Sequence, residues 1–277
     1  MPIDGLRIGL EKLFPSKLVL KAEQTLTSGV SKCHLIAYDE MANKYYQTGE
    51  GRAPKVRDLF AAVAPRYDLI NDLQSLGLHR VWKKTLVTMT GACQGEKALD
   101  VCCGTGDLAR NLANQGAEVT GLDFSDAMLA VARAKDSAGR VTWLQGDALN
   151  LPFQDETFHI VTIGYGLRNL RDFSLALTEF FRVLRAGGRM AILDFGKPDN
   201  AVWRSVYLGY LRWFVPLFGK LFCGDAQTHS YIVESLKHYP AQRGIAELIS
   251  KLGGQDVRTV NLLGGAMSIT VARKPTA

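Results

Sequence analysis

The sequence predicts an α/β protein built on a mostly parallel sheet whose last strand runs antiparallel. From about residue 97 to residue 274, short β-branched apolar runs alternate with helical patterns, as they do in repeated βαβ units. The last two apolar runs flank Gly264 and Gly265, with few residues between them. A parallel crossover needs about a dozen residues or more, so these two runs must form a hairpin.

Each element is expected where the hydrophobic pattern changes its period. Gly187 and Gly188 supply a turn before the fifth strand. Strands are expected at Ala98–Cys102, Glu118–Leu122, Val141–Gln145, His159–Ile163, Met190–Phe195, Asp256–Leu262 and Met267–Arg273. Helices are expected at about Asp107–Gln115, Asp126–Lys135, Phe173–Leu184 and Gln242–Leu252.

Two segments interrupt this alternation. Residues 52–90 have helical patterns with a break at Pro65, and we expect them to form a lid over the strand ends. Residues 202–240 are expected to form a cap that is inserted after the fifth strand and begins with VWRSVYLGYLRWFVPLFGKLF. With these additions, residues 41–277 are expected to form a single domain.

The first forty residues carry no motif and join awkwardly to the rest of the chain. Met41 is followed by a small residue and then a polar one, as at a translation start. We therefore expect residues 1–40 to be a poorly ordered extension or the product of a misassigned upstream start. The alternative is an amphipathic arm built from Leu6, Leu10, Leu13 and Phe14.

Composition narrows the class of protein and its location. The chain has 277 residues, of which 47% are hydrophobic and 22% charged, and this excludes disordered, collagenous and disulfide-scaffold proteins. No uncharged apolar run reaches the roughly 18 residues of a membrane span. The start of the chain lacks the apolar region of a secretory signal, because Asp4, Arg7 and Glu11 interrupt it. Five cysteines without metal-ligand or disulfide spacing favour a reducing cytoplasm and no metal site.

A glycine loop follows the first expected strand in the sequence DVCCGTGDLA. Gly104 and Gly106 allow a tight turn and the close approach of a ligand, and the helix that starts at Asp107 points free amides at the same place. Nicotinamide-dependent oxidoreductases share this pattern and are an alternative. An acid at Asp107 disfavours a pyrophosphate and favours S-adenosylmethionine, whose amine and sulfonium are cationic. We therefore expect Asp100, Gly104 and Gly106 to bind S-adenosylmethionine.

Acidic residues also end the next two strands. Asp123 lies 23 residues after Asp100, close to the spacing at which a carboxylate binds both ribose hydroxyls. Asp147 follows the third strand, where it is placed to accept a hydrogen bond from an adenine amino group, with Ala148 and Leu149 against the ring. The alternative is that each acid only caps the next helix. Three acids at one edge of the sheet, together with the glycine loop, favour the cofactor site.

Five segments together resemble the C-methyltransferases of menaquinone and ubiquinone biosynthesis, from about residue 44 to the end of the chain. They are APRYDLINDLQSLGLHRVWKK, DVCCGTGDLA, GLDFSDAML, DALNLPFQDETFHIVTIGYGLRNLRD and RVLRAGGRMAILDFGKP. The resemblance implies a Rossmann-like class I methyltransferase with a seven-stranded sheet, S-adenosylmethionine as cofactor and a polyprenylated quinol as substrate. It places Thr105, Asp123 and the pair Asp147-Ala148 at the family's cofactor-binding positions, and Gly164 is expected to complete this set.

One triplet departs from the family pattern. Many bacterial members have a serine two residues before the GLRN segment, where this chain has Gly164-Tyr165-Gly166. This variant is associated with relatives that methylate phytylated naphthoquinols. The choice between a benzoquinol and a naphthoquinol, and the prenyl length, therefore stay open.

C-methylation needs a ring carbon that becomes nucleophilic when a neighbouring quinol hydroxyl loses its proton. Arg168, in the GLRN segment, is expected to stabilise the phenolate or to orient a water that takes the proton. Asn169 is expected to bond the second ring oxygen, and Tyr67 and His79 of the lid are candidates for substrate orientation or general base work. The alternative is structural for each of them: a loop-holding Arg-Asn pair and a satisfied histidine in a helix.

The expected partners are a polyprenylated quinol, the surface of a membrane and a second copy of the chain, at a cytoplasmic location that includes the inner face of the cytoplasmic membrane. Aromatic residues with basic flanks in residues 202–222 suit the lipid headgroup boundary, and the alternative is that they fill the core of the cap. The net charge of +6 permits nucleic acid as a partner, but the sequence has no RNA-binding appendage, so none is expected. O-methylation of a small molecule on the same fold is a further alternative.

Overall fold

The computed structural model describes residues 43–276 with the exception of residues 44, 47–48 and 226. The chain divides into two units after residue 42, and all described residues belong to the second unit. The extension expected at residues 1–40 lies outside the described residues.

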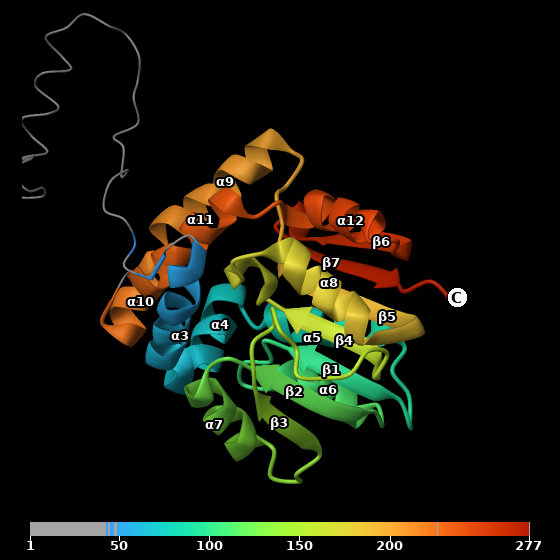
Figure 1. Ribbon diagram of the computed structural model, residues 1–277. Helices are drawn as coiled ribbons and strands as arrows, with labels where there is room; N and C mark the ends of the chain where they lie inside the picture. Colours follow the sequence, from blue (N-terminus) through green and yellow to red (C-terminus); the bar gives the residue numbers. More distant parts are fainter. Residues whose placement is uncertain (1–42, 44, 47–48, 226, 277) are drawn as a thin grey trace, which may run out of the picture. The chain divides into compact units, whose positions relative to one another are not determined.

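A seven-stranded mixed sheet forms the centre of the described unit, as Figure 1 shows. The strands are ordered β3-β2-β1-β4-β5-β7-β6, and within this sheet β7 is antiparallel to both of its neighbours. The α/β fold and the hairpin of the last two strands, both expected from the sequence, are confirmed. The strands are β1 (Lys97–Val101), β2 (Glu118–Asp123), β3 (Val141–Gln145), β4 (Phe158–Gly164), β5 (Leu184–Phe195), β6 (Gln255–Leu262) and β7 (Met267–Arg273).

Helices cover both faces of the sheet because its central strands are apolar on both sides. In β1, Ala98 packs into the core on one face and Leu99 into the core on the other, and both side chains are fully buried. The first face is covered by α5 (Leu78–Thr90) and α6 (Asp107–Asn114), and the second by α8 (Phe173–Val183) and α12 (Ala241–Lys251). Another helix, α7 (Asp126–Lys135), packs beside β2 and β3.

The segment 52–90 folds as three α-helices with different surroundings. α3 (Arg52–Val63) ends at a 3-10 turn that contains Pro65, so the expected break is confirmed. The next helix, α4 (Tyr67–Ser75), is followed by α5, which packs on the sheet through Trp82 and Leu86. Only the α3 and α4 part of the expected lid therefore stands over the strand ends, because α5 belongs to the layer that covers the sheet.

Three further helices form the cap: α9 (Ala201–Trp213), α10 (Val215–Cys223) and α11 (Gln227–His238). In Figure 1 they gather with α3 and α4 at one end of the sheet. Asn200 starts α9, since its side chain accepts a hydrogen bond from the Trp203 amide at 2.9 Å. Over the part of the chain that the structure describes, no helix has both the length and the apolar character of a membrane span.

The turn expected at Gly187 and Gly188 is wrong, because β5 begins earlier, at Leu184, and runs through both glycines. Gly187 takes a positive φ of 71°, and the pairing with β4 shifts register beyond Phe158. The chain end supports this irregular start of the strand: Gly187 donates to the Lys274 carbonyl at 3.1 Å, and Lys274 donates to the Gly188 carbonyl at 2.9 Å. The glycines therefore form a bulge inside the strand.

Candidate active site

Two cavities lie at the carboxyl ends of the parallel strands and adjoin each other. The larger encloses about 640 Å³ and the smaller about 150 Å³. Three aromatic side chains, Phe60, Tyr67 and Tyr165, line both cavities. Groups bound in the two cavities can therefore meet at these side chains.

The smaller cavity is lined by the segments that follow β1, β2, β3 and β4 and by α3. Asp123 and Asp147 contribute carboxylates to its lining, and Ala148 and Leu149 contribute apolar groups. The predicted cofactor-binding residues that the structure brings together here are Gly104, Asp123, Asp147, Ala148 and Gly164.

Asp123 ends β2 and is held in one orientation by the backbone. Its Oδ2 accepts a hydrogen bond from the Gly104 N–H at 2.8 Å, and its Oδ1 accepts one from the Ser125 N–H at 2.8 Å. Burial raises the pKa of Asp123, and the backbone donors act in the opposite direction. Each carboxylate oxygen can accept more than one hydrogen bond, so both oxygens keep acceptor capacity for a pair of neighbouring hydroxyls.

Three other predicted cofactor residues do not line the smaller cavity and instead support its loop. Asp100 accepts a hydrogen bond from Thr162 Oγ1 at 2.8 Å, and burial raises its pKa to about 7. Thr105 Oγ1 donates to Asp68 Oδ1 at 2.7 Å, which joins the loop to α4. Gly106 has a φ of +79°, and an added Cβ would lie 2.3 Å from the ring of Trp143.

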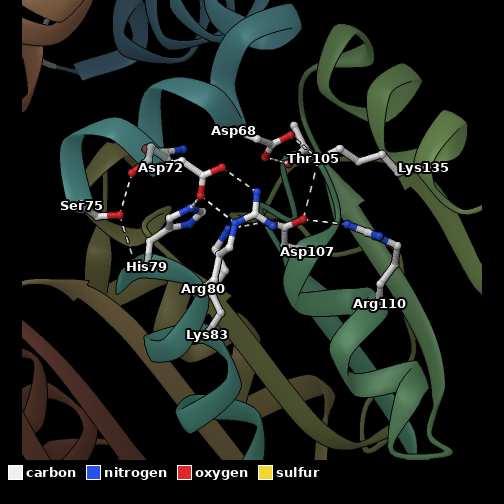
Figure 2. A network of polar contacts seen from close by, with 11 residues as sticks. Asp68, Asp72, Ser75, His79, Arg80, Lys83, Thr105, Asp107, Arg110 and Lys135 are labelled. Atoms are coloured by element: carbon white, nitrogen blue, oxygen red, sulfur yellow. Dashed lines mark hydrogen bonds and ion pairs between the residues drawn. The ribbon is translucent and has the colours of Figure 1, made fainter. Parts of the chain in front are cut away.

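Asp107 is surrounded by cations, as Figure 2 shows. It pairs with Lys83 Nζ at 3.0 Å, with Arg110 Nη2 at 2.7 Å and with Lys135 Nζ at 3.7 Å. These contacts hold the pKa of Asp107 at about 2, against the effect of its burial. The carboxylate is therefore ionised and paired within the chain, and it does not line the smaller cavity, so the effect of its charge on the choice of cofactor stays a prediction.

The wall of the larger cavity presents mostly apolar surface, contributed by α3, α4, α5, α9, α10 and α11 and by the ends of β5 and β7. Its volume lies within the roughly 300–1,000 Å³ typical of small-molecule sites. Three predicted catalytic residues, Tyr67, His79 and Arg168, lie on its wall. The fourth, Asn169, lies on the smaller cavity.

Arg168 is buried on a 3-10 turn, Leu167–Asn169, directly after β4. Its Nη1 donates to Asp194 Oδ1 at 3.2 Å and also to the Tyr165 carbonyl. The guanidinium carbon lies 4.6 Å from the centroid of the Phe195 ring. Its Nε is buried and has no hydrogen-bond partner among the described residues.

His79 is 3% exposed and forms a pair with Asp72 in α4, as Figure 2 shows. Its Nε2 lies 2.8 Å from Asp72 Oδ1, and Arg80 donates to both oxygens of the same carboxylate at 2.6 and 2.7 Å. Arg80 holds the pKa of Asp72 well below its usual range, so the carboxylate can only accept and Nε2 carries the hydrogen. His79 Nδ1 then carries a lone pair, and it has no partner among the residues described.

Tyr67 lines both cavities, whereas Asn169 lines only the smaller one. The Asn169 amide donates to the Tyr165 carbonyl at 3.1 Å, and its Oδ1 is buried without a partner in the described part of the chain. Burial raises the pKa of Tyr67 to about 12, so its hydroxyl keeps its proton near neutral pH. Tyr67 is therefore suited to hydrogen bonding and not to proton abstraction.

Two residues of this site were not predicted from the sequence. Asp194 is the last residue but one of β5 and is the counter-ion of Arg168, and burial raises its pKa although Arg168 opposes that effect. The rule that identified the acids at the ends of earlier strands applies to Asp194 as well. Tyr165 has a left-handed φ of 62° and presents its carbonyl to both Arg168 and Asn169. The glycines on both sides of it were the available signal.

The fold matches that of solved methyltransferase structures. A SAM-dependent methyltransferase from Thermotoga maritima superposes with a TM-score of 0.57 at 17% identity, covering 78% of this chain and 99% of that one. At this identity the likeness shows the fold alone. The expected class I methyltransferase fold is thereby confirmed.

Sequence relatives are much closer. A 2-phytyl-1,4-naphtoquinone methyltransferase of Thermosynechococcus vestitus is 46% identical over 225 residues, which are 79% of this chain and 99% of the relative. A ubiquinone/menaquinone biosynthesis C-methyltransferase of Azotobacter vinelandii is 39% identical over 231 residues, covering 81% and 91%. The model of the ubiE/COQ5 methyltransferase family matches residues 47–274. The family resemblance expected from the sequence is confirmed, the oxidoreductase alternative is removed, and the chain is a methyltransferase that belongs to the ubiE/COQ5 methyltransferase family.

Proposed function

We propose that this methyltransferase transfers the methyl group of S-adenosylmethionine to a ring carbon of a prenylated quinol. The observation that carries the proposal is the pair of adjoining cavities, one with carboxylates and glycines at the strand ends and the other large and apolar. A nucleoside cofactor suits the first cavity, and a ring with a long apolar tail suits the second. The names of the relatives support a naphthoquinol or benzoquinol ring.

The residues of the smaller cavity fit an adenosine group. Asp123 would accept hydrogen bonds from the two ribose hydroxyls, Ala148 and Leu149 would lie against the adenine, and Asp147 would accept from its amino group. When bound, the cofactor supplies an electrophilic methyl group on a sulfonium. Gly104, which has open space where a Cβ would stand, allows the backbone to approach it closely.

Replacing Asp123 with alanine is expected to weaken S-adenosylhomocysteine binding by about 1.5–3 kcal/mol, the range for hydrogen bonds to a charged group. Calorimetric titration measures this change. Asp123→Asn is the matched control, because it keeps an oxygen that can accept from a loop amide but removes the charge. Unchanged affinity in both variants would remove Asp123 from the cofactor site.

In the larger cavity, the protein has to favour a phenolate and hold the ring. Arg168 offers a buried cation with a free Nε–H, and hydrogen bonding to a developing phenolate lowers the barrier most in a site that excludes water. His79 offers a lone pair at Nδ1 for the proton of the quinol hydroxyl. Asn169, whose Oδ1 is unsatisfied among the described residues, would bond the second ring oxygen.

We further propose that the cap contacts a membrane surface, from which the prenyl tail enters the larger cavity. The cap has two faces: Tyr207, Leu211 and Val215 are buried, whereas Trp213 and Phe214 are 67% and 61% exposed. Residues 201–224 include three basic residues and no acidic residue, and among the described residues none of the three basic side chains forms an ion pair. Exposed aromatic rings with unpaired cations suit an anionic lipid interface.

The rim of the larger cavity supports the same proposal. Leu76 and Leu263 both line this cavity, and they are 87% and 50% exposed. Both have left-handed backbones, with φ of 50° and 47°, a conformation that costs energy for a leucine and that glycine or asparagine would adopt more easily. Contact with lipid at the entrance of the larger cavity explains why these two leucines stand at positions that are both strained and exposed.

Replacing Trp213 and Phe214 with serine is expected to reduce binding to vesicles of phosphatidylglycerol at low salt, measured by co-sedimentation. Wild-type binding should be weak and should fall as salt screens the basic residues. Leu175→Ser is the control, since this side chain is 39% exposed on α8 and lines neither cavity. Wild-type protein that does not bind at low salt, or a folded double variant that binds equally well, would contradict the membrane proposal.

The function itself is tested with methyl-labelled S-adenosylmethionine and paired demethylnaphthoquinol and demethylbenzoquinol substrates with prenyl tails. Mass analysis of the product is expected to show the label on a ring carbon. A label on oxygen would identify an O-methyltransferase instead. Absence of turnover with every quinol would refute the proposed substrate class.

A further inference from the structure

Arg52 is a buried arginine at a position where helix physics alone disfavours one. It is the first residue of α3, and the N-terminal end of a helix repels a positive charge. Only 4% of the residue is exposed, and it has no acidic partner among the described residues. Burying a charge without a counter-ion is costly unless the charge makes strong hydrogen bonds, so the chain keeps Arg52 for a specific contact.

That contact is with the turn that carries Arg168 and Asn169. Arg52 Nη2 donates to the Arg168 carbonyl at 2.5 Å, and its Nε donates to the Asn169 carbonyl at 3.0 Å. The two bonds join residues that are more than 110 positions apart in the chain. A planar guanidinium can hold two successive carbonyls at once, which a lysine ammonium cannot do with the same geometry.

Arg52 is itself fixed from its other side. Its guanidinium carbon lies 5.0 Å from the centroid of the Tyr46 ring. That ring stacks on His238 of α11, and the Tyr46 hydroxyl lies 2.8 Å from His238 Nδ1. Arg52 thus connects the cap helix α11 to the turn after β4.

The helix that Arg52 begins also forms part of both cavities. Ala53 and Val56 of α3 line the smaller cavity, Leu59 and Val63 line the larger, and Phe60 lines both. Arg52 therefore begins the helix that lines both cavities and also binds the turn that carries Arg168.

We infer that Arg52 is a positioning residue for methyl transfer: its two hydrogen bonds fix the Arg168–Asn169 turn against α3, so that the Arg168 guanidinium is aligned with the acceptor ring. The inference rests on the proposed function, because it assigns Arg52 an effect exerted through Arg168. Arg52 lines neither cavity, so it touches neither cofactor nor acceptor.

A double-mutant cycle between Arg52→Gln and Arg168→Lys tests this inference. Arg52→Gln alone is expected to lower kcat about 10- to 100-fold, as small misplacements of a catalytic group do, while S-adenosylhomocysteine affinity stays within about twofold. Because Arg52 acts through Arg168, adding Arg52→Gln to Arg168→Lys is expected to lower kcat by no more than about twofold further. If the double variant instead loses kcat by the product of the two single-variant reductions, the two residues act independently. Arg52 would then have a separate structural role, and the inference would be overturned.

Further variants separate this outcome from a general loss of folding. Lys55→Gln removes a cation from the same helix, lines neither cavity and is expected to leave kcat unchanged. Arg52→Lys keeps the charge but reaches only one carbonyl at a time. Its kcat is therefore expected to lie between those of wild type and Arg52→Gln. If Arg52→Gln does not fold, Arg52→Lys takes its place in the cycle. Full turnover in a folded Arg52→Gln or Arg52→Lys protein would overturn the inference. A wild-type enzyme that methylates no quinol would refute the proposed function instead.

Discussion

Replacing Arg168 with lysine is expected to lower kcat by about 100- to 1,000-fold, the loss observed when one preorganised donor to a developing oxyanion is removed. Lysine keeps the positive charge beside Asp194 but loses the planar fork, in which Nη1 binds Asp194 and the Tyr165 carbonyl while Nε stays free. In the proposed mechanism, the Nε–H is the donor to the phenolate. Steady-state kinetics with the quinol acceptor, at saturating cofactor, measure the change.

The lysine variant is more informative than alanine at this position. Arg168→Ala would leave the buried Asp194 carboxylate without its cation, and breaking a buried pair in this way typically costs about 3–5 kcal/mol of stability. Loss of activity would then be inseparable from loss of structure. Arg168→Lys should keep a thermal midpoint near that of wild type and an unchanged affinity for S-adenosylhomocysteine, because Arg168 does not line the smaller cavity. A lysine variant with full turnover would return Arg168 to a loop-holding role.

The strand-end residues were predictable because a parallel sheet imposes a simple geometry. Successive parallel strands end at one edge, so Asp123 and Asp147 had to converge whatever the details of their loops. The same reasoning applied to β5 would have identified Asp194. Hydrophobic periodicity was sufficient for most strands and helices for a related reason: burial on both faces makes most residues of the central strands apolar, although Asp100 and Thr162 are buried exceptions.

Contacts between distant side chains were not predictable in this way. The charge of Asp107 was visible in the sequence, but its neutralisation depends on Lys83 from α5 and Lys135 from α7, which only packing brings together. The sequence indicated that the loop needs a glycine at Gly106, but it did not indicate the close approach of the Trp143 ring from β3. No local pattern relates Arg52 to Arg168.

Replacing His79 with glutamine is expected to lower kcat by about 100- to 10,000-fold, the usual contribution of a general base. His79 accepts a proton only in its neutral form. Burial and the nearby Lys83 lower the pKa of His79 from 6.5, although Asp72 opposes both effects. The neutral form therefore persists through physiological pH, and wild-type kcat/KM is expected to be flat there and to fall as the pH drops through this lowered pKa, below 6.5.

The pH profile separates His79 from other proton acceptors. In His79→Gln the acidic limb should disappear, because glutamine does not titrate. In Asp72→Asn the limb should move to still lower pH, because the carboxylate that raises the pKa of His79 is lost, and turnover should fall because Nε2 no longer has a fixed acceptor. If His79→Gln keeps both its rate and its acidic limb, the proton leaves by another route, and the water oriented by Arg168 becomes the better candidate.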